Sequence, residues 1–246
     1  MSKTAIIVGA SSGIGAALAE ELAVRGYRLG LMARREDKLK EVAEGISRRH
    51  GVIVLTHPVD VCASADVQPA IMALAEDLGQ VDLLIANAGI IAARRSGNGQ
   101  LEVDRQVIET NLLGAIATID AGVALFKTQG KGHIVGISSI SAFVGIPGSA
   151  AYSASKAALT NYLSALRTEV GHQGIRITTI HPGFVATDLA PGMEKYPFVA
   201  QPGAVAKEIC QAVERGAREA IVPRWPWAAM MPMMRFLPDA VIRRIF

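Results

Sequence analysis

Short, continuous apolar runs recur along the chain, separated by longer stretches in which apolar residues return every third or fourth position. The short runs do not alternate between apolar and polar residues. This pattern indicates strands that are buried on both faces, as in a parallel sheet covered by helices. Seven such runs predict strands, at 5–8, 28–33, 52–56, 81–86, 133–137, 175–180 and 220–222.

Apolar residues at helical spacing fill the intervals between these runs. Ile14, Leu18 and Leu22 recur at i, i+4 and i+8, and Gly26 is placed to end that helix. Ser64 is expected to cap a later helix that closes at Gly79. Further helices are expected at 36–49, near 100–127 and near 150–172.

The alternation of strands and helices predicts the fold class. A repeated β-α order with right-handed crossovers gives an α/β fold of the Rossmann type: a doubly wound, seven-stranded parallel sheet flanked by helices on both faces. The chain has 246 residues, of which 50% are hydrophobic, and this is enough for a full core. No linker or low-complexity stretch interrupts it, so we expect one nucleotide-binding domain over residues 1–246.

Charge and cysteine content narrow the classes of function. Charged residues make up 19% of the chain, the net charge is +3 and no Lys/Arg run exceeds two residues, which argues against a nucleic-acid partner. Cys62 and Cys210 lack metal-site spacing and are too few for a disulfide scaffold, so we expect two reduced, buried thiols and no metal. We see neither a secretory leader nor an uninterrupted apolar run of membrane-spanning length, and therefore expect a cytoplasmic location.

A glycine-rich turn follows the first strand and opens the first helix. Glycines let the backbone turn tightly and approach a pyrophosphate, while the helix N-terminus offers free N–H groups and a partial positive charge. An ordinary tight turn could have the same composition, but the position between a strand and an amphipathic helix favours nucleotide binding. The candidate phosphate-binding residues are Gly9, Ser11, Ser12, Gly13, Ile14 and Gly15.

Two arginines stand where the second strand ends. A site for NAD usually has Asp or Glu there to bind the ribose 2′-hydroxyl, whereas this chain has Arg34 and Arg35 after Ala33. Two solvated arginines at a helix start would be mildly unfavourable, so that alternative leaves them unexplained. An arginine fork suits a 2′-phosphate, and the sequence therefore favours NADP(H), with NAD(H) as the alternative.

A tyrosine, a lysine and a serine form the candidate catalytic set. Tyr152 and Lys156 lie four residues apart, on one face of a predicted helix. A free phenol has a pKa of about 10 and a nearby ammonium stabilises the phenolate, so Tyr152 can act as a general acid or base. Ser139 follows the fifth strand, where a hydroxyl can hydrogen-bond a substrate oxygen. No Gly-x-Ser-x-Gly motif surrounds it, which argues against a hydrolase.

With these residues in this order, the chain resembles the short-chain dehydrogenase/reductase family in its Tyr-x-x-x-Lys branch, as far as residue 222. The resemblance implies that Asn111 holds a water in the proton relay and that Ser139, Tyr152 and Lys156 are catalytic. It also implies that Lys156 binds the nicotinamide ribose, and that hydride passes directly from nicotinamide C4 without a metal. The remaining cofactor contacts that it implies are Asp60 and Val61 at the adenine, Asn87, Ala88 and Gly89 after the fourth strand, and Pro182, Gly183, Val185 and Thr187 at the nicotinamide.

Two later segments carry alternatives. Residues 188–203 are expected to cover the substrate, with Met193, Tyr196 and Phe198 as an apolar lid, or to form a plain surface loop. The tail at 224–246 is rich in Trp, Met and Phe, with arginines among them. It is expected to pack on the core or an oligomer interface, to wall the substrate pocket with methionines, or to lie on an anionic membrane surface.

The sequence therefore predicts an NADP(H)-dependent oxidoreductase acting on a small, hydrophobic carbonyl or alcohol. The alternatives are a catalytically silent nucleotide sensor or scaffold, and a reductase attached peripherally to a membrane through its tail. The complete candidate set favours the enzyme, because the fold alone would not decide between these classes. By analogy with the family, a homo-dimer or homo-tetramer built on the two long helices is expected.

Overall fold

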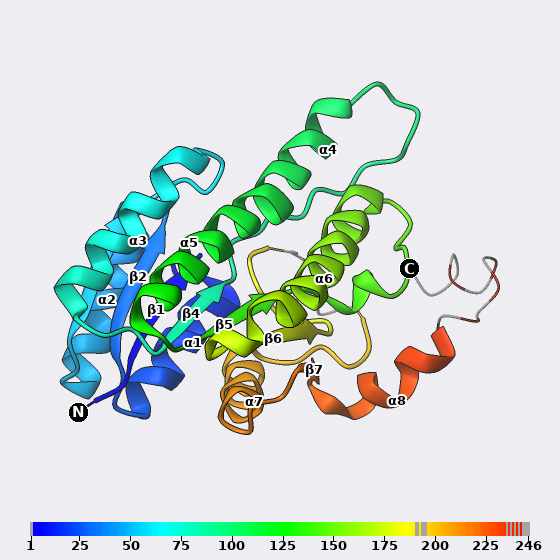
Figure 1. Cartoon of the computed structure of the whole chain (residues 1–246). Coiled ribbons are helices and arrows are strands. Elements are labelled where there is room, and N and C mark those ends of the chain that lie inside the picture. Colours follow the sequence, from blue (N-terminus) through cyan, green and yellow to red (C-terminus); the bar gives the residue numbers. More distant parts are fainter. Residues whose placement is uncertain are drawn as a thin grey trace.

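A parallel β-sheet organises the chain. The computed structural model describes residues 2–189, 192, 196–234, 236, 238, 240 and 242. Its strands pair in the order β3-β2-β1-β4-β5-β6-β7, and every pairing is parallel. Helices cover both faces of this sheet (Figure 1). The predicted doubly wound, Rossmann-type fold is therefore confirmed.

Each strand that the apolar runs predict is present, with somewhat shifted ends. The strands are β1 (Thr4–Val8), β2 (Arg28–Ala33), β3 (Val54–Pro58), β4 (Leu83–Ala86), β5 (Gly132–Ile137), β6 (Ile175–Pro182) and β7 (Glu219–Val222). The ends of β3 follow its pairing with β2, which runs from Leu29↔Val54 to Ala33↔Pro58, and not the limits of the apolar run.

Helices connect these strands in turn. They are α1 (Gly13–Val24), α2 (Glu36–His50), α3 (Ser64–Leu78), α4 (Leu101–Ile108), the π-helix η1 (Glu109–Leu113), α5 (Gly114–Gln129), the 3₁₀-helices η2 (Ile140–Ala142) and η3 (Gly171–Gln173), α6 (Ala150–Val170), α7 (Pro202–Glu214) and α8 (Arg224–Met234). The expected long segment near 100–127 is thus three consecutive elements, with a π-helix in the middle.

The sheet separates two apolar cores. Ile7 of β1 belongs to the core shared with α1, α2 and α7, whereas its neighbour Ile6 belongs to the core shared with α3, α5 and α6. This division follows from the strand geometry, in which successive side chains point to opposite faces. Because both faces are covered, the central strands can be apolar along their whole length.

Two local predictions are wrong. Ser64 is the first residue of α3 and not its cap; Ala63 holds the cap position, and no side-chain hydrogen bond caps the helix. Cys62 is exposed and not buried, whereas Cys210 is buried in α7 as expected. Cys62 follows β3, an edge strand, so the chain has already left the covered part of the sheet there.

One helical segment, Leu101–Gln129, meets the length and composition expected of a membrane-crossing helix, because its most apolar 18-residue window has a mean hydropathy of 1.3. The segment is not an uninterrupted apolar run, because charged residues interrupt it. Half of its most apolar window is buried inside the protein, and α5 packs against α3 and β5. A core helix covering a sheet satisfies the same composition test.

The first part of the tail packs on the chain itself. Trp227 and Met231 are buried in a small cluster with Ile140 and Val144, while Trp225 is 78% exposed. Of the three alternatives for 224–246, the described residues therefore support packing on the protein's own core. Much of the segment after Met231 lies outside the described side chains.

Candidate active site and cofactor cleft

The sequence-predicted site residues gather at the carboxyl edge of the sheet. The strand order reverses between β1 and β4, which pair in register from Ala5↔Leu83 to Val8↔Ala86. Open α/β sheets place their ligands in the crevice at such a reversal. The glycine-rich turn after β1 and the Asn87–Gly89 segment after β4 therefore line one crevice.

Close backbone packing explains the glycines of the turn. Gly9 has φ +92°, and a Cβ placed on it would lie 2.5 Å from the backbone nitrogen of Ala88. A Cβ on Gly15 would lie 2.0 Å from the Gly9 oxygen. The Asn87 side chain donates from Nδ2 to that same oxygen at 2.7 Å. Asn87 and Ala88 therefore act as the frame that holds the turn in place.

The N-terminus of α1 is left uncapped by side chains. Ser12 holds the cap position but makes no capping hydrogen bond, so the first N–H groups of the helix, including that of Ile14, are not capped by its side chain. Gly13 has φ +58°, and a Cβ on it would lie 3.3 Å from Cγ2 of Thr187. These open donors fit the pyrophosphate of a dinucleotide.

The two arginines after β2 have different partners. Arg35 Nη2 donates to the hydroxyls of Ser11 at 3.1 Å and Ser12 at 2.8 Å. Arg34, with 72% of its side chain exposed, instead faces Asp60 at 3.6 Å. Arg35 thus lies on the glycine-rich turn, whereas the charge of Arg34 is partly compensated by Asp60.

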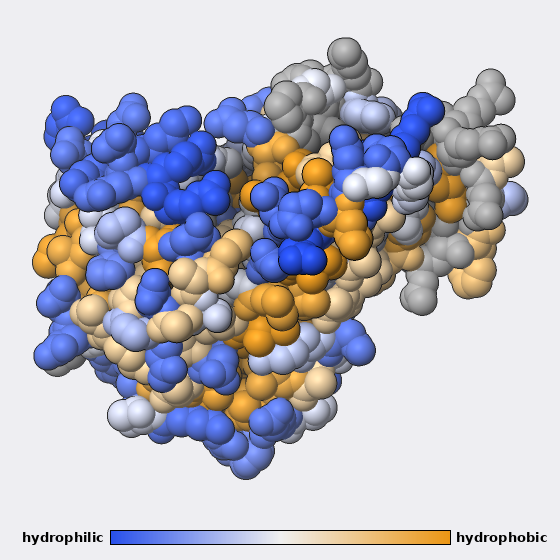
Figure 2. Space-filling view, turned by 90° about the horizontal axis from the view of Figure 1, so that it is seen from above, coloured by the Kyte–Doolittle hydropathy of each residue, from blue (hydrophilic) through white to orange (hydrophobic). Residues whose placement is uncertain are grey.

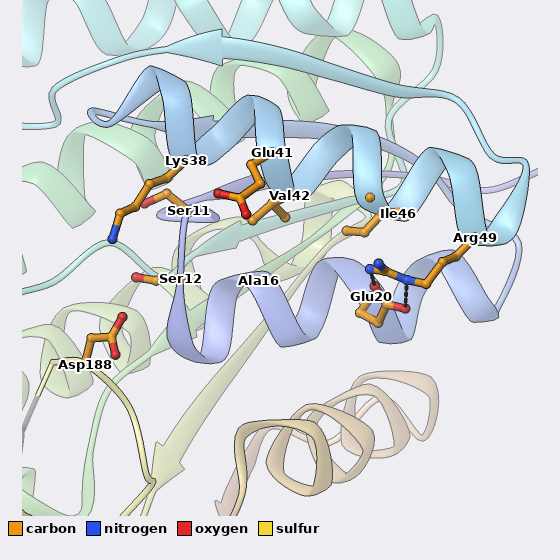
Figure 3. A pocket seen from close by; sticks show the side chains of 11 residues that line it. Ser11, Ser12, Ala16, Glu20, Lys38, Glu41, Val42, Ile46, Arg49 and Asp188 are labelled. Carbon is orange, nitrogen blue, oxygen red and sulfur yellow. Dashed lines mark hydrogen bonds and ion pairs between the residues drawn. The ribbon is translucent and has the colours of Figure 1, made fainter.

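A groove of about 430 Å³ continues from the turn between α1 and α2. Figure 3 shows Lys38 of α2 and Asp188 near Ser11 and Ser12, and the ion pair of Glu20 with Arg49 further along. Sequence reasoning missed Lys38. Its position four residues after Arg34, in the first turn of the helix that follows the two arginines, was the available signal.

The predicted adenine contacts lie directly after β3. Asp60 accepts from the backbone nitrogen of Cys62 at 3.0 Å, which orders the turn. Val61 is buried against Gly114, where a Cβ would lie 2.6 Å from Val61 Cγ2. Asp60 therefore stays accessible at the cleft while Val61 anchors the turn to α5.

The candidate catalytic side chains converge between β5 and α6. Lys156 is buried, and its Nζ donates to the Ile137 carbonyl at 2.9 Å and lies 5.8 Å from the centre of the Tyr152 ring. Burial lowers the pKa of Lys156 to about 8, which leaves it largely protonated at pH 7. Ser139 is buried at the end of β5, and its Oγ accepts from the backbone nitrogen of Ser141 at 3.1 Å.

The pKa of Tyr152 depends on two opposing effects. Burial raises it, and the neighbouring Ser139 hydroxyl lowers it by a smaller amount. The sequence argument expected Lys156 to lower this pKa, but burial is the larger effect in the protein alone. A positive charge next to the phenol would shift the pKa downward.

Asn111 ties three elements together from inside the π-helix. It is fully buried, its Oδ1 accepts from the backbone nitrogen of Ile90 at 2.7 Å, and its Nδ2 donates to the Ile90 carbonyl at 2.8 Å. Nδ2 also lies 3.3 Å from Ser155 Oγ on α6. A Cβ on Gly89 would come within 3.6 Å of both Asn111 and Lys156, so glycine leaves room where these side chains meet. Ile90 and Ser155 were not expected from the sequence.

The predicted nicotinamide segment leaves the end of β6. Pro182 closes that strand, and the Gly183 nitrogen donates to the Val222 carbonyl at 2.8 Å. A Cβ on Gly183 would lie 2.3 Å from Trp227 Nε1, so the tail packs on this glycine. Val185 is buried and pairs with Ala200 in an isolated β-bridge. The segment then reaches Thr187 beside the phosphate turn.

The proposed substrate loop is only partly described. The Tyr196 ring lies 5.4 Å from that of Phe184, as expected of an apolar cover. Phe198 is exposed, with φ 64°, so in this arrangement it does not close over the cleft. Met193 lies outside the described residues.

Among the described residues, no group of three or more His, Cys, Asp or Glu side chains is placed to hold a metal ion. The polar groups at the cleft are instead hydroxyls, amides and cations. This set of donors suits phosphate, ribose and carbonyl oxygens.

Comparison with known proteins agrees with this geometry. The sequence model of the short chain dehydrogenase family matches residues 3–196. The chain is 36% identical to an uncharacterized oxidoreductase of Mycobacterium tuberculosis over 97% of this chain and 95% of the relative. It is also 36% identical to an uncharacterized oxidoreductase of Myxococcus xanthus, over 99% and 97%.

Solved structures share the fold. An alcohol dehydrogenase from Thermococcus sibiricus, complexed with 5-hydroxy-NADP, has a TM-score of 0.82 at 30% identity and covers 90% of this chain and 96% of its own. A variant of actinorhodin polyketide ketoreductase with NADPH has a TM-score of 0.83 at 27% identity, over 90% and 95%. The chain therefore belongs to the short-chain dehydrogenase/reductase family of oxidoreductases.

Proposed function

We propose that this protein is an NADP(H)-dependent oxidoreductase that interconverts a carbonyl and an alcohol on a small, hydrophobic molecule. The observation that carries the cofactor preference is the contact of Arg35 with the hydroxyls of Ser11 and Ser12. A 2′-phosphate bound there would meet a guanidinium and two hydroxyls, and guanidinium–phosphate pairs are among the strong hydrogen bonds. NAD(H) would leave this cation without its anionic partner.

The chain's own residues divide the chemistry between them. The nicotinamide, when bound, supplies the hydride. Tyr152 donates a proton to the substrate oxygen in the reductive direction and accepts it in the oxidative one. Ser139 hydrogen-bonds the same oxygen and stabilises the charge that develops there. Lys156 binds the ribose and favours the phenolate, and the charge of an oxidised nicotinamide acts in the same direction.

Apolar side chains near the catalytic groups support a hydrophobic substrate. Phe143 and Val144 follow Ser139, and Phe184 and Tyr196 lie on the opposite segment. Ligand sites of this kind are mostly apolar, with a few polar groups that fix orientation.

The test is a titration of the purified protein with NADPH and NADH, followed by absorbance of the reduced nicotinamide with a panel of ketones, aldehydes and diketones. Tighter binding of NADPH and its oxidation by a panel member are the expected results. Tight binding without any turnover across a broad panel would favour the nucleotide-sensor alternative. Equal affinity for both cofactors would contradict the proposed preference.

We also propose a cytoplasmic homo-dimer or homo-tetramer. Leu101 and Leu113 are exposed at the start of α4 and in η1, and Figure 2 shows apolar surface gathered in the middle of one face. Light scattering after size exclusion should give a multiple of the 25.9 kDa chain mass, and a monomer at micromolar concentration would contradict it. Co-sedimentation with anionic vesicles would instead favour a membrane-attached reductase.

A further inference from the structure

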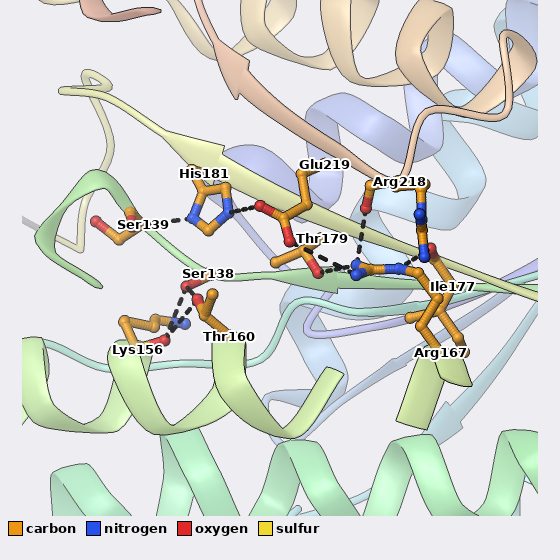
Figure 4. Close-up of polar contacts among 10 residues, drawn as sticks. All are labelled: Ser138, Ser139, Lys156, Thr160, Arg167, Ile177, Thr179, His181, Arg218 and Glu219. Atoms are coloured by element: carbon orange, nitrogen blue, oxygen red, sulfur yellow. Dashed lines mark hydrogen bonds and ion pairs between the residues drawn. The ribbon is translucent and has the colours of Figure 1, made fainter. Parts of the chain in front are cut away.

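A buried histidine lies next to the candidate catalytic serine. His181 of β6 is 1% exposed, and Figure 4 shows its ring between Ser139 on one side and Glu219 on the other. Its Nδ1 lies 3.3 Å from the Ser139 carbonyl oxygen, and its Nε2 lies 3.7 Å from Glu219 Oε2. The first distance suits a long hydrogen bond, whereas the second is an ion-pair distance without one.

The chemistry of the two neighbours determines which ring nitrogen carries the proton. Burial lowers the pKa of His181, so the ring is neutral near pH 7 and has a single N–H. A backbone carbonyl can only accept, so the contact with Ser139 is attractive only when Nδ1 carries that hydrogen. Nε2 then makes no hydrogen bond among the described residues.

The charged groups around the ring allow this arrangement. Glu219 faces it from β7, and Arg167 of α6 lies 3.6 Å from Glu219, which offsets the carboxylate charge that would draw the proton to Nε2. Arg167 is itself held in place. It donates to Thr179 Oγ1 at 2.9 Å and to the Arg218 carbonyl at 2.9 Å. The Phe143 ring also packs against it, 4.6 Å away between ring centres.

The Ser139 carbonyl also accepts from the backbone nitrogen of Ala142 at 3.1 Å. The residue leaves β5 in an extended conformation and caps the short helix η2. Its hydroxyl must point toward Tyr152 to act on the same substrate oxygen. A second donor on this carbonyl, from the His181 side chain, further restrains rotation of Ser139 about its own backbone, and the direction of the hydroxyl depends on that rotation.

We propose that His181 is a positioning residue for the catalytic serine: its Nδ1–H holds the Ser139 carbonyl and thereby sets the direction of the Ser139 hydroxyl. The inference rests on the proposed function of Ser139 and Tyr152. Arg167 offsets the charge of Glu219 and so allows the required tautomer, and in this way the far end of α6 and the edge strand β7 contribute to the geometry of the active site.

Two amide substitutions separate this role from packing. In His181→Asn, the side-chain nitrogen can take the place of Nδ1 and keep the bond to Ser139. In His181→Gln, the nitrogen takes the place of Nε2 and loses that bond. We expect the asparagine variant to keep kcat close to wild type, and the glutamine variant to lose about 10-fold in kcat, as for one hydrogen bond. The affinity for NADPH should not change in either.

His181→Leu provides a second variant without a donor, in case the glutamine variant does not fold. It fills a similar volume beside Phe143 and should show the same loss in kcat. Equal losses in the asparagine variant and in a donor-free variant, with equal thermal midpoints, would overturn the proposal in favour of plain packing. Wild-type kcat in a donor-free variant would also overturn it.

The pKa of Tyr152 is an independent readout that needs no turnover. The Ser139 hydroxyl lowers this pKa, and Lys156 lies on the same helix, so a misdirected serine should raise it while Lys156 stays in place. Phenolate absorbance against pH, corrected with Tyr152→Phe, measures the shift. A shift of the Tyr152 pKa in the glutamine variant but not in the asparagine variant supports the positioning role, whether or not a substrate is turned over. A complete lack of turnover would count against the proposed function and not against the positioning role. An unchanged pKa in the glutamine variant would overturn the positioning role.

Discussion

The two ends of the cleft are built from polar groups in opposite environments. At the nucleotide end, Arg34, Arg35 and Lys38 are all exposed; the two arginines directly precede α2, and Lys38 lies in its first turn. At the catalytic end, Lys156 and His181 are buried and each contacts a backbone carbonyl. Exposed charges are screened by water and salt, whereas buried groups are held in one geometry and have shifted pKa values.

This difference suggests that the residues expected to choose the cofactor are distinct from those expected to carry out the reaction. Exposed cations contribute little to folding but remain available to an anion, so we expect the nucleotide end to select its cofactor by charge. Buried polar groups need hydrogen-bond partners, so a substitution at the catalytic end is expected to affect folding, protonation and reactivity together. Substitutions at the two ends should therefore give different kinds of result.

The largest effect is expected for Tyr152→Phe. The substitution removes the proton donor but keeps the ring and its packing near Lys156. We expect kcat to fall by at least about 100-fold, the lower range for general acid–base catalysis, with NADPH affinity nearly unchanged. Stopped-flow absorbance and a binding titration measure the two quantities. Turnover at the wild-type rate would remove Tyr152 from the mechanism.

The nucleotide end should respond to single arginine substitutions. Arg35→Ala is expected to weaken NADPH binding on the order of 100-fold, as for a charged hydrogen-bonding partner, and to leave NADH binding nearly unchanged. Arg34→Ala is the matched control and should lose less, because Asp60 already compensates that charge. Fluorescence titration with both cofactors measures the difference. A larger loss in Arg34→Ala would put the 2′-phosphate on the Asp60 side instead.

Buried His133 predicts a pH-dependent stability at the catalytic half of the sheet. It contacts Thr178 Oγ1 at 2.8 Å, and burial lowers its pKa from 6.5 to about 4. The unfolded chain takes up this proton at a higher pH than the folded chain does. The stability that the folded protein gains from keeping His133 neutral is therefore fully present above pH 6.5 and is lost as the pH falls toward 4.

Between pH 7 and pH 5, this histidine should account for about 2 kcal/mol of the fall in the free energy of unfolding. His133→Gln, which retains a polar side chain for Thr178, should show a correspondingly flatter pH dependence in urea melts. An identical slope in the variant and the wild type would mean that folding does not lower the pKa of His133.

The smallest effect is expected at an exposed ion pair on α2. Lys40 lies 2.7 Å from Glu36 one helical turn away, and both side chains are largely exposed. Lys40→Ala should leave the thermal midpoint and both cofactor affinities unchanged, because such pairs gain little in water. A clear drop in midpoint would mean that exposed charges also support the fold at the nucleotide end.

Local patterns were sufficient for most of the fold. Apolar runs located the strands because each is buried on both faces, and the glycine turn was located by its place between a strand and a helix. Tyr152 and Lys156 could be paired because four residues make one helical turn. Helix caps and sheet edges were harder to predict from local patterns. Ser64 and Cys62 both depart from expectation, because they follow β3 and their environment depends on where that strand lies in the sheet.

Some site residues carry no local signal. His181 and Glu219 lie just outside the predicted strands at 175–180 and 220–222, and only the β6–β7 pairing brings them together beside Ser139. Gly136 has a similar explanation: a Cβ there would lie 2.3 Å from Leu163, so the approach of α6 to β5 requires glycine.

The sequence by itself determined the order of the elements, the family and the residue types available for chemistry, because these depend on near neighbours along the chain. The tertiary structure decided that Arg35 and not Arg34 contacts the phosphate turn, that burial is the main influence on Tyr152, and that His181 contacts Ser139. Distances and desolvation across the sheet determine these features, and such contacts join residues too far apart in the chain for any periodic pattern to record them.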